Sequence, residues 1–568
     1  MSLADLRERG LIDLLDLELA RALGRMTGSP NPDVELAIAL TSRNVRRGHT
    51  CFPVGMSAAD IWPRDAVPPD ALPDTEHWKD ALTNSRLTQE GPLVLDSVGR
   101  LYLRRYWQLE QDIAEELAAR SAIPPAITGD LDASLGRLFP GAPDSPQRRA
   151  AHNALNHRVS LLCGGPGTGK TTTVAAIAAL IIEARLLETG TLPRVALLAP
   201  TGKSAARLGE AVREAKSRIQ ASAEVLEQIP EQAMTMHRAL GMQREGMRFR
   251  RNADFPLEAD VVVVDEASMI DLGLMRQLLH ATSREATLLI VGDPDQLTSV
   301  EAGSVLRDLV SASTETWWHG RVSHLSKTYR YDERQALGQL VAAIRNGEAA
   351  TVAALLEDEE ADDVAWVSLE GLQPELDRAA KHWCNVLRTR KPEEHFELRS
   401  GFVVLSPFRR GPVGTRQLSA AIRDRLLGLD GSALDTTPII IEENSHELRV
   451  YNGDFAMLVD GEPRTAVVQS DPGEPRRIAE ARLPRFSDAF ALSVHKAQGS
   501  EFDEVLIVLP EQDAPMLTRE LLYTAVSRAR KRVRLVGPQS TVAAALARRA
   551  QRHSGLQDAI KNAIRNPS

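Results

Sequence analysis

The stretch CGGPGTGKTTT at residues 163–173 decides the fold class of this 568-residue chain. Its core, Gly164–Thr171, matches the pattern G-x-x-x-x-G-K-[ST] in full. It follows the apolar run Val159–Cys163 and opens a helical pattern over Thr172–Leu186. Glycines let backbone N–H groups wrap around phosphates, and the N-terminus of the next helix favours their negative charge. The succession of strand, loop and helix therefore predicts a nucleotide-binding α/β domain.

The side chains of this loop have distinct expected roles toward ATP. The Lys170 ammonium would neutralise the β- and γ-phosphates, and the Thr171 hydroxyl would hold Mg²⁺. We expect the whole run to surround the nucleotide: Gly164, Gly165, Pro166, Gly167, Thr168, Gly169, Lys170, Thr171 and Thr172. The alternative is a chance glycine-rich turn, and the strand and helix on either side argue against it.

Two sets of apolar runs, each alternating with helical stretches, predict two parallel sheets covered by helices on both faces. The first set is VSLLC, RVALLAP, VVVVDE and TLLIVGD, between residues 159 and 293. The second set is GFVVLSPF at 401–408, FALSV at 490–494, EVLIVLP at 504–510 and RVRLVG at 532–537. Short strands with Gly, Asn and Pro turns at 431–484 interrupt the second set. They suit a small β-barrel inserted in the second lobe.

The region before the first sheet has a different pattern. Helical stretches alternate with proline-rich loops, and PLVLDSVGRLYLRRYW at 92–107 has the alternation of a hairpin. We therefore expect a mixed, mainly helical N-terminal domain. The expected bounds are 1–125 for this domain, 126–318 for the first lobe, 319–430 and 485–568 for the second lobe, and 431–484 for the insert.

Polar residues follow the third and fourth strands of the first set. Asp265 and Glu266 end the run that begins at Val261, and carboxyl ends of strands face the ligand crevice of a doubly wound sheet. Asp265 suits the Mg²⁺ shell and Glu266 suits polarisation of the attacking water. Gln296, in GDPDQ after the next strand, is placed to sense the γ-phosphate. Two ordinary alternatives stay open: a helix N-cap at Ser268, and simple turn chemistry in Gly-Asp-Pro-Asp.

Composition excludes some classes of function. The 43% hydrophobic and 26% charged content is ordinary for a globular protein. No apolar run reaches the ~18 residues of a membrane span, and the first ten residues lack the features of a signal peptide. Cys51, Cys163 and Cys384 lie too far apart for a disulfide framework or a zinc site, so a reducing, cytoplasmic setting is expected.

The net charge of −9 is unevenly distributed along the chain. Residues 1–120 carry 14 basic and 19 acidic side chains, whereas residues 515–568 carry 11 and 2. Such polarity suggests different partners for the two ends, although solvated helix faces could also differ by chance. The overall negative charge does not exclude a local basic channel for nucleic acid.

The C-terminal stretches SVHKAQGSEFDEVLIV and LLYTAVSRARKRVRLVG narrow the class. With the two sheets, over about Asp144–Pro538, they resemble the motor of superfamily 1 helicases. In that family ATP lies between two RecA-like lobes and single-stranded DNA crosses both. The resemblance implies that Gln147 reads adenine. It also implies that Arg330, in LSKTYR, and Arg528, in AVSRAR, stabilise the transferring phosphoryl group from the second lobe.

The same resemblance implies a DNA path across both lobes. APTGKSAARL at 199–208 and TMHR at 235–238 would contact DNA from the first lobe, and SVHKAQGSEF at 493–502 from the second. In that last turn, Gln498 and Gly499 would lie near the nucleotide, so the turn would couple the two ligands. The residues expected to bind DNA are Pro200, Thr201, Lys203, Thr235, His237, Ser493 and His495.

Four further stretches are similar to the RecD family, the α subunits of exodeoxyribonuclease V (RecBCD). They are GHTCFP at 48–53, PLVLDSVGRLYLRRYW at 92–107, SPFRRGPVGTRQLSAAI at 406–422 and YNGDF at 451–455. The similarity implies an ATP-dependent 5′→3′ DNA translocase and helicase subunit in double-strand-break repair and recombination. Its expected partners are single-stranded and duplex-end DNA and RecB-like and RecC-like subunits.

Two alternative functions stay open. One is a stand-alone superfamily 1 helicase acting on DNA or RNA. The other is a nucleotide-gated docking subunit whose ATPase drives assembly without translocation. The motor and the docking subunit differ in whether ATP turnover rises steeply with single-stranded DNA.

Overall fold

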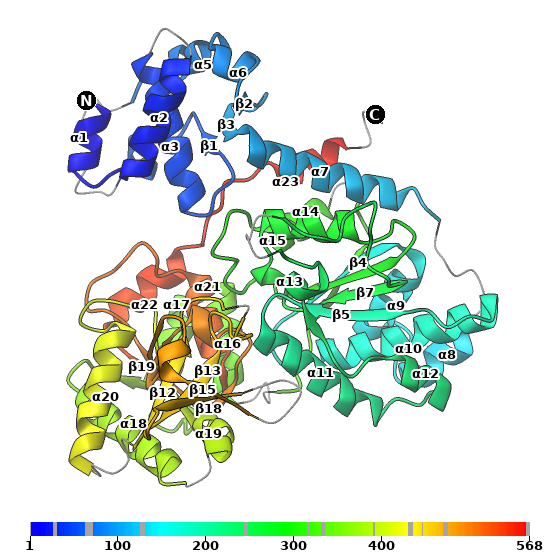
Figure 1. Ribbon diagram of the computed structural model, residues 1–568, viewed down its shortest axis with the longest axis vertical. Helices are drawn as coiled ribbons and strands as arrows, with labels where there is room; N and C mark the ends of the chain where they lie inside the picture. The colour runs from blue at the N-terminus through cyan, green and yellow to red at the C-terminus, as the bar shows by residue number, and fades with distance from the viewer. Residues whose placement is uncertain are drawn as a thin grey trace.

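The structure is a computed structural model that consists of three bodies, a small N-terminal body and two larger lobes (Figure 1). It describes residues 2–26, 31–62, 72–124, 131–243, 248–314, 317–330, 335–389, 392–429, 435–445, 447–469 and 475–563. A small N-terminal body, blue in Figure 1, adjoins two larger α/β lobes that lie side by side. None of the helices that the structure describes has the length and apolar content of a membrane span.

The first lobe contains a six-stranded parallel sheet in the order β6-β5-β7-β8-β4-β9. Its strands are β4 (Val159–Gly164), β5 (Val195–Ala199), β6 (Met234–Thr235), β7 (Val261–Val264), β8 (Thr287–Gly292) and β9 (Val322–Leu325). Four of them match the apolar runs of the first set, so the predicted parallel sheet is confirmed. β9 lies past the bound that we predicted at 318, and it pairs with β4.

Helices cover both faces of this sheet because its strands are apolar on both faces. One face shares a core with α8 (Asp132–Leu138), α9 (Pro146–Asn156), α10 (Lys170–Thr189), α11 (Gly202–Lys216) and α12 (Ala223–Gln228). The other face shares a core with α13 (Met236–Ala239), α14 (Leu272–Ala281) and α15 (Val305–Ala312). A short 3₁₀ helix, η2 (Ala267–Met269), follows β7. Because the strands are parallel, their carboxyl ends all lie at the same edge of this covered sheet.

The second lobe contains a five-stranded parallel sheet in the order β10-β19-β18-β11-β17. Its strands are β10 (Val364–Val367), β11 (Phe402–Ser406), β17 (Ala491–Ser493), β18 (Phe502–Val508) and β19 (Ala529–Val536). Its helices are α16 (Ala336–Asn346), α17 (Ala349–Glu357), α18 (Leu372–Leu387), α19 (Pro392–Leu398), α20 (Thr415–Leu429), α21 (Arg519–Val526) and α22 (Gln539–Ala547), with η3 (Arg399–Gly401) and η6 (His495–Ala497). The second predicted parallel sheet is confirmed, with β10 as an added edge strand.

The insert is a five-stranded antiparallel sheet in the order β15-β14-β13-β12-β16. Its elements are β12 (Thr436–Ile441), β13 (Phe455–Val459), β14 (Thr465–Val468), β15 (Arg476–Ala479), η5 (Glu480–Arg482) and β16 (Phe486–Asp488). The two edge strands, β15 and β16, are not paired with each other among the described residues. The β-barrel that we predicted is therefore not confirmed.

Successive side chains along the insert strands belong to two different cores, which explains how an open sheet is buried. Ile440, Met457 and Val467 face the core of the second lobe. Their neighbours, among them Ile439 and Leu458, form a separate small core on the opposite face. Because successive strand residues point to opposite faces, both faces are covered without closing the sheet into a barrel.

The N-terminal body has its own core. Its elements are α1 (Leu3–Glu8), α2 (Leu14–Met26), α3 (Pro32–Arg46), β1 (Phe52–Pro53), α4 (Ala58–Ile61), α5 (Thr75–Thr83), α6 (Arg86–Gln89), β2 (Leu93–Leu95) and β3 (Arg100–Leu103). The predicted hairpin is confirmed, since β2 and β3 pair antiparallel. The body is mainly helical, as predicted.

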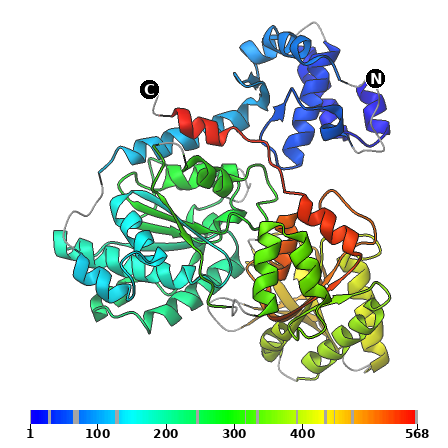
Figure 2. The same ribbon diagram turned by 180° about the vertical axis from the view of Figure 1, so that it is seen from behind.

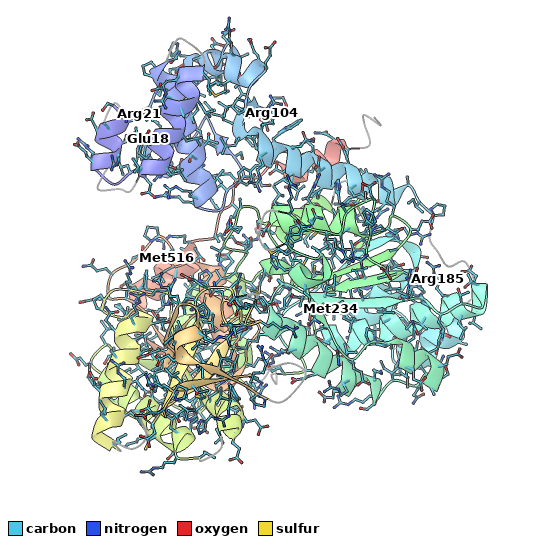
Figure 3. All side chains as sticks on the ribbon, viewed as in Figure 1. Glu18, Arg21, Arg104, Arg185, Met234 and Met516 are labelled. Atoms are coloured by element: carbon cyan, nitrogen blue, oxygen red, sulfur yellow. The ribbon has the colours of Figure 1, made fainter. Side chains whose placement is uncertain are left out.

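Two helices link the N-terminal body to the first lobe. α7 (Arg104–Ser121) starts at Arg104 and packs on α14, and its Ile113 and Leu117 belong to the first-lobe core (Figures 1 and 3). α23 (Leu556–Asn562), which we placed with the second lobe, packs instead beside α7 and joins the same core (Figure 2). Residues 104–121 and 556–562, which are far apart in sequence, therefore both contribute to the lobe that carries the phosphate loop.

Candidate active site

The phosphate loop between β4 and α10 is shaped by its glycines. Gly167 and Gly169 have φ angles of 75° and 78°, in the left-handed region that favours glycine. The Lys170 Nζ donates to the carbonyl oxygens of Gly164 and Gly165, at 2.7 and 2.9 Å. The ammonium is therefore held over the loop, where a phosphate oxygen could replace a carbonyl as its partner.

Two carboxylates follow β7 beside this loop. Asp265 accepts a hydrogen bond from the backbone N–H of Glu266 at 2.8 Å. Burial, and then the charge of Glu266, raise the pKa of Asp265 to about 6, against the opposing effect of Lys170. Glu266 has a φ of 53°, a strained conformation for a residue with a side chain and one that clusters at functional sites. The Ser268 hydroxyl, the alternative helix cap, makes no hydrogen bond with the described residues.

β8 ends in a second polar cluster. Asp293 is buried and accepts hydrogen bonds from the Gln296 Nε2 and from the backbone N–H of Asp295, both at 3.1 Å. Burial raises the pKa of Asp293, and the nearby Lys170 charge opposes that rise. Gln296, the expected γ-phosphate sensor, therefore lies one hydrogen bond from a carboxylate beside the loop lysine.

The two lobes meet in a buried set of hydrogen bonds that we call the interlobe seam. It consists of Asp293, Gln296 and Leu297 of the first lobe with Gln498, Tyr523, Thr524 and Arg528 of the second. The backbone N–H of Leu297 donates to Thr524 Oγ1 at 2.9 Å, and Arg528 Nη2 donates to Gln296 Oε1 at 3.3 Å. Gln498 Nε2 donates to the Leu297 carbonyl at 3.1 Å. The expected arginine and the expected coupling glutamine thus contact one short segment of the first lobe.

Arg330 has a different partner. Its guanidinium pairs with Glu501, which also pairs with Arg207 of α11 and with Arg530, the last at 3.2 Å. A Cβ on Gly167 would lie 2.3 Å from the Arg330 Cβ, so Arg330 stands against the phosphate loop. Burial, with Arg330 as the next cause, lowers the pKa of Arg207 to about 10. The charge of Arg330 is therefore paired with Glu501, beside the phosphate loop.

An exposed aromatic ring lies beside the expected adenine-reading residue. Gln147, on α9, has its Nε2 3.5 Å from the hydroxyl of Tyr329. Tyr329 is 63% exposed, and its backbone N–H donates to the Gly167 carbonyl at 2.7 Å. Its ring would lie 3.7 Å from a Cβ on Gly169. Such a ring next to the phosphate loop offers a stacking surface for a base.

The N-terminus of α11 meets the SVHKAQGSEF turn. Thr201 caps α11 by accepting from the backbone N–H of Ser204 at 3.2 Å. Lys203 donates to the Ser500 hydroxyl, and burial lowers its pKa well below the usual value. Gly499 has a φ of 69°, and a Cβ there would lie 3.0 Å from the Ser204 hydroxyl. The two expected DNA-contacting motifs are therefore in direct contact with each other.

The other first-lobe residues expected on DNA share one edge of the sheet. Pro200 follows β5 and Thr235 ends β6, and these two strands are paired in parallel. Thr235 caps α13 by accepting from the backbone N–H of Arg238 at 3.2 Å. His237 lies beside Phe249, with ring centroids 6.2 Å apart. The neighbouring Met234 is exposed at the same edge (Figure 3).

Ser493 lines a cavity of about 280 Å³ between the second-lobe sheet and the insert. Its basic lining residues are Arg409, Arg416, Arg423 and Lys496. Glu442 and Asp488 offset part of that charge, through pairs with Lys496 at 3.8 Å and with Arg423 at 2.7 Å. His495 lies just beyond the strand, and burial lowers its pKa. A cavity with this excess of cations suits the phosphate of a nucleic-acid backbone.

Several residues of the site were absent from the expected set. They include Arg207, Asp293, Tyr329, Glu501 and Tyr523. Each lies within a stretch already singled out, such as GDPDQ or LSKTYR, so their position inside a motif was the available signal. Their contacts, however, join segments that are far apart along the chain, and no local pattern encodes such a pairing.

This architecture defines a class of protein. Arg330, which we expected on the second lobe, follows β9 of the first lobe and lies beside the phosphate loop, whereas Arg528 comes from the second lobe. Two parallel-sheet lobes that meet beside a phosphate loop resemble the ATPase motors of superfamily 1 helicases. Family models agree: an AAA domain matches residues 147–302, and a UvrD-like helicase C-terminal domain matches residues 488–536. A third model, the N-terminal domain of RecBCD enzyme subunit RecD, matches residues 8–102.

Curated relatives narrow the class to a family. The RecBCD enzyme subunit RecD of Mycobacterium tuberculosis is 38% identical over 97% of this chain and 95% of its own length. The ATP-dependent RecD2 DNA helicase of Deinococcus radiodurans is 32% identical over 82% of this chain and 59% of its own length. The chain belongs to the RecD family, the ATP-dependent helicase subunits of exodeoxyribonuclease V.

Solved structures add only a distant similarity. The crystal structure of Bacteroides Pif1 bound to ssDNA covers 71% of this chain and 94% of its own, with 14% identity and a TM-score of 0.38.

Proposed function

We propose that the chain is an ATP-driven 5′→3′ DNA translocase and helicase subunit of a RecBCD-like exodeoxyribonuclease V, acting in double-strand-break repair and recombination. The observation that carries this proposal is the interlobe seam. There Gln296, from the lobe with the phosphate loop, meets Arg528 and Gln498 from the other lobe. A triphosphate bound at Lys170 would change the contacts that join the lobes, and relative lobe motion is what moves a motor along a strand. The reducing cytoplasm is the proposed setting, because all three cysteines are free buried thiols.

Mg²⁺ is the proposed cofactor beside ATP. Thr171 and Asp265 offer hard oxygen ligands, and protein-bound Mg²⁺ usually combines one or two such ligands with waters and substrate phosphates. The raised pKa of Asp265 beside Glu266 also fits a cation site, since a bound cation would favour the ionised carboxylate. When bound, Mg²⁺ would neutralise charge on the β- and γ-phosphates.

The chain's own residues divide the remaining work of ATP hydrolysis. Lys170 and the loop N–H groups would bind the phosphates. Glu266 would orient the attacking water and accept its proton. Gln296, Arg330 and Arg528 would stabilise charge on the transferring phosphoryl group once the lobes are together. In this proposal ATP must displace Arg330 from Glu501 before Arg330 can contribute.

Single-stranded DNA would cross the edge where both lobes present their motifs. On the first lobe this edge carries the cap of α11 and the β6 end, and on the second it carries the SVHKAQGSEF turn. The basic cavity at Ser493 would take one backbone phosphate. Phosphate contacts of this kind bind without sequence preference and weaken with salt, which suits a motor that must act on any broken end.

The test uses ATP and duplexes that carry a 5′ or a 3′ single-stranded tail, with the purified chain alone and with RecB-like and RecC-like subunits. We expect steep stimulation of ATP turnover by single-stranded DNA and unwinding from the 5′ tail. Turnover that DNA does not stimulate would favour a docking subunit without translocation. Equal stimulation by RNA, or unwinding from the 3′ tail, would contradict the stated substrate or polarity.

Gln498→Ala should uncouple hydrolysis from movement. Gln498 holds the Leu297 carbonyl in the interlobe seam, while its neighbour Gly499 touches α11 at Ser204. We expect a measurable remainder of DNA-stimulated ATP turnover and a larger loss of translocation, measured as unwound base pairs per ATP. Gln108→Ala, at an exposed glutamine of α7, is the control and should keep the wild-type ratio. Equal losses of both activities would remove the coupling role.

The N-terminal body is the proposed docking site for partner subunits, most directly a RecC-like one. Its acidic balance makes it a poor surface for phosphate backbones, and it precedes every motif of the ATP site. Deleting residues 1–103 should leave DNA-stimulated ATPase activity and abolish co-purification with partners. Deleting residues 1–124 should instead unfold the chain, because it also removes Ile113 and Leu117 from the first-lobe core. A folded 1–103 deletion that still assembles would move the docking surface to the lobes.

A further inference from the structure

Tyr523, a residue of the interlobe seam, was given no role in the function proposed above. Tyr523 lies on α21, the helix that leads to Arg528, and its side chain is buried. Its hydroxyl donates to Asp293 Oδ2 at 2.9 Å, across the boundary between the lobes. Burial raises the pKa of this phenol well above the usual value. The hydroxyl therefore keeps its proton and remains a donor throughout the physiological pH range.

The same hydroxyl lies against the phosphate loop. A Cβ placed on Gly165 would stand 2.8 Å from the Tyr523 hydroxyl, and the next nearest atom would be Asp293 Oδ2 at 4.0 Å. The Gly165 carbonyl is one of the two that hold the Lys170 ammonium. Tyr523 is thus a point where the second lobe touches both the backbone of the phosphate loop and the carboxylate beside it.

Asp293 connects Tyr523 to two other residues of the site, Gln296 and Arg528. Asp293 Oδ2 accepts from Tyr523 and from the Gln296 Nε2, so the tyrosine and the glutamine share one oxygen. The oxygen of the same Gln296 amide accepts from Arg528. The orientation of the Gln296 amide therefore depends on a carboxylate that Tyr523 fixes, and the Arg528 guanidinium depends on that amide in turn.

We propose that Tyr523 is a positioning residue that makes contact between the two lobes a condition for ATP hydrolysis, a role that rests on the function proposed above. With the lobes together, Tyr523 fixes Asp293, and Asp293 fixes the amide that faces the γ-phosphate. With the lobes apart, the hydroxyl is withdrawn and Gln296 loses its fixed orientation. Catalysis by positioned groups is sensitive to small displacements of those groups.

Tyr523→Phe is the direct test, because it removes one oxygen and keeps the buried ring. We expect kcat for DNA-stimulated ATP hydrolysis to fall on the order of 10-fold and the KM for ATP to change by less than about 3-fold, since a contact that orients groups for the transition state acts on kcat. Tyr102→Phe removes a buried phenol hydroxyl from the N-terminal body. It is the matched control for lost stability and should leave kcat and KM unchanged.

Gly165→Ala gives a second measurement, which tests the contact between the Tyr523 hydroxyl and the phosphate loop. The added methyl group would meet the Tyr523 hydroxyl at 2.8 Å, closer than van der Waals contact allows, so kcat should fall in the wild-type background. Tyr523→Phe removes the oxygen that causes this clash. The fold-loss caused by Gly165→Ala should therefore be smaller in the Tyr523→Phe background than in the wild type.

Two results would overturn the proposal: wild-type kcat in Tyr523→Phe, or a Gly165→Ala loss of equal size in both backgrounds. A failure of the proposed function is distinguishable from either, because the wild-type chain itself would then show no stimulation of ATP turnover by single-stranded DNA.

Discussion

Lys170→Ala should reduce ATP turnover and DNA unwinding to background. The ammonium is held over the phosphate loop by the Gly164 and Gly165 carbonyls, at 2.7 and 2.9 Å, where it would neutralise the β- and γ-phosphates. Phosphoryl transfer depends almost entirely on such positioning and charge stabilisation. The fold should survive, since Lys170 begins α10 and alanine is a good helix former. The measurements are DNA-stimulated ATP turnover and the melting temperature.

Lys79→Ala is the control for the loss of a lysine elsewhere. Lys79 forms an exposed pair with Glu76 in the N-terminal body, and such pairs contribute little to stability. Its turnover should equal that of the wild type. Near-wild-type turnover in Lys170→Ala would refute the assignment of the phosphate loop.

The parts of the fold that could be predicted are those that local pattern encodes. Strands that are buried throughout, such as β4, β7, β8 and β11, read as continuous apolar runs, as Val261–Val264 does. β6 and β9 were missed because Met234–Thr235 is too short to show a pattern and Val322–Leu325 contains the polar residues Ser323 and His324. The packing of α23 beside α7 joins opposite ends of the chain, and no local pattern carries that information.

The candidate site likewise has parts that local sequence predicts and contacts that it does not. The phosphate loop is one short contiguous stretch and the Asp265–Glu266 pair is another. Each can therefore be found from local sequence alone. Pairings across the lobes are different, because the hydroxyl of Tyr523 and the carboxylate of Asp293 meet only after both lobes have folded. The ion pair of Arg330 with Glu501 is another such case. A motif can identify the arginine, but it cannot identify the carboxylate that pairs with it.

Arg528→Ala should lower ATP turnover on the order of 10³-fold, the scale of an arginine that stabilises the transferring phosphoryl group. Arg528 is only 3% exposed. Its guanidinium donates to the Thr524 carbonyl at 3.0 Å, and to the Ser500 carbonyl and Gln296 Oε1 at 3.3 Å each. Since the phosphate loop keeps all its own residues, nucleotide binding should be retained. The measurements are kcat and the affinity for a fluorescent ATP analogue.

Arg528→Lys separates the charge from the shape of this side chain. Lysine keeps the positive charge but lacks the planar fork that donates to three acceptors at once, so its turnover should lie between those of the wild type and Arg528→Ala. Arg532→Ala, on the neighbouring strand β19 and paired with Glu504 at 3.1 Å, is the matched control and should turn over ATP at the wild-type rate. A variant that loses DNA affinity and keeps its ATPase rate would place Arg528 in the DNA path. Equal activity of the lysine and arginine forms would mean that charge alone suffices, and that the seam contacts with Gln296 and Ser500 do not position Arg528 for catalysis.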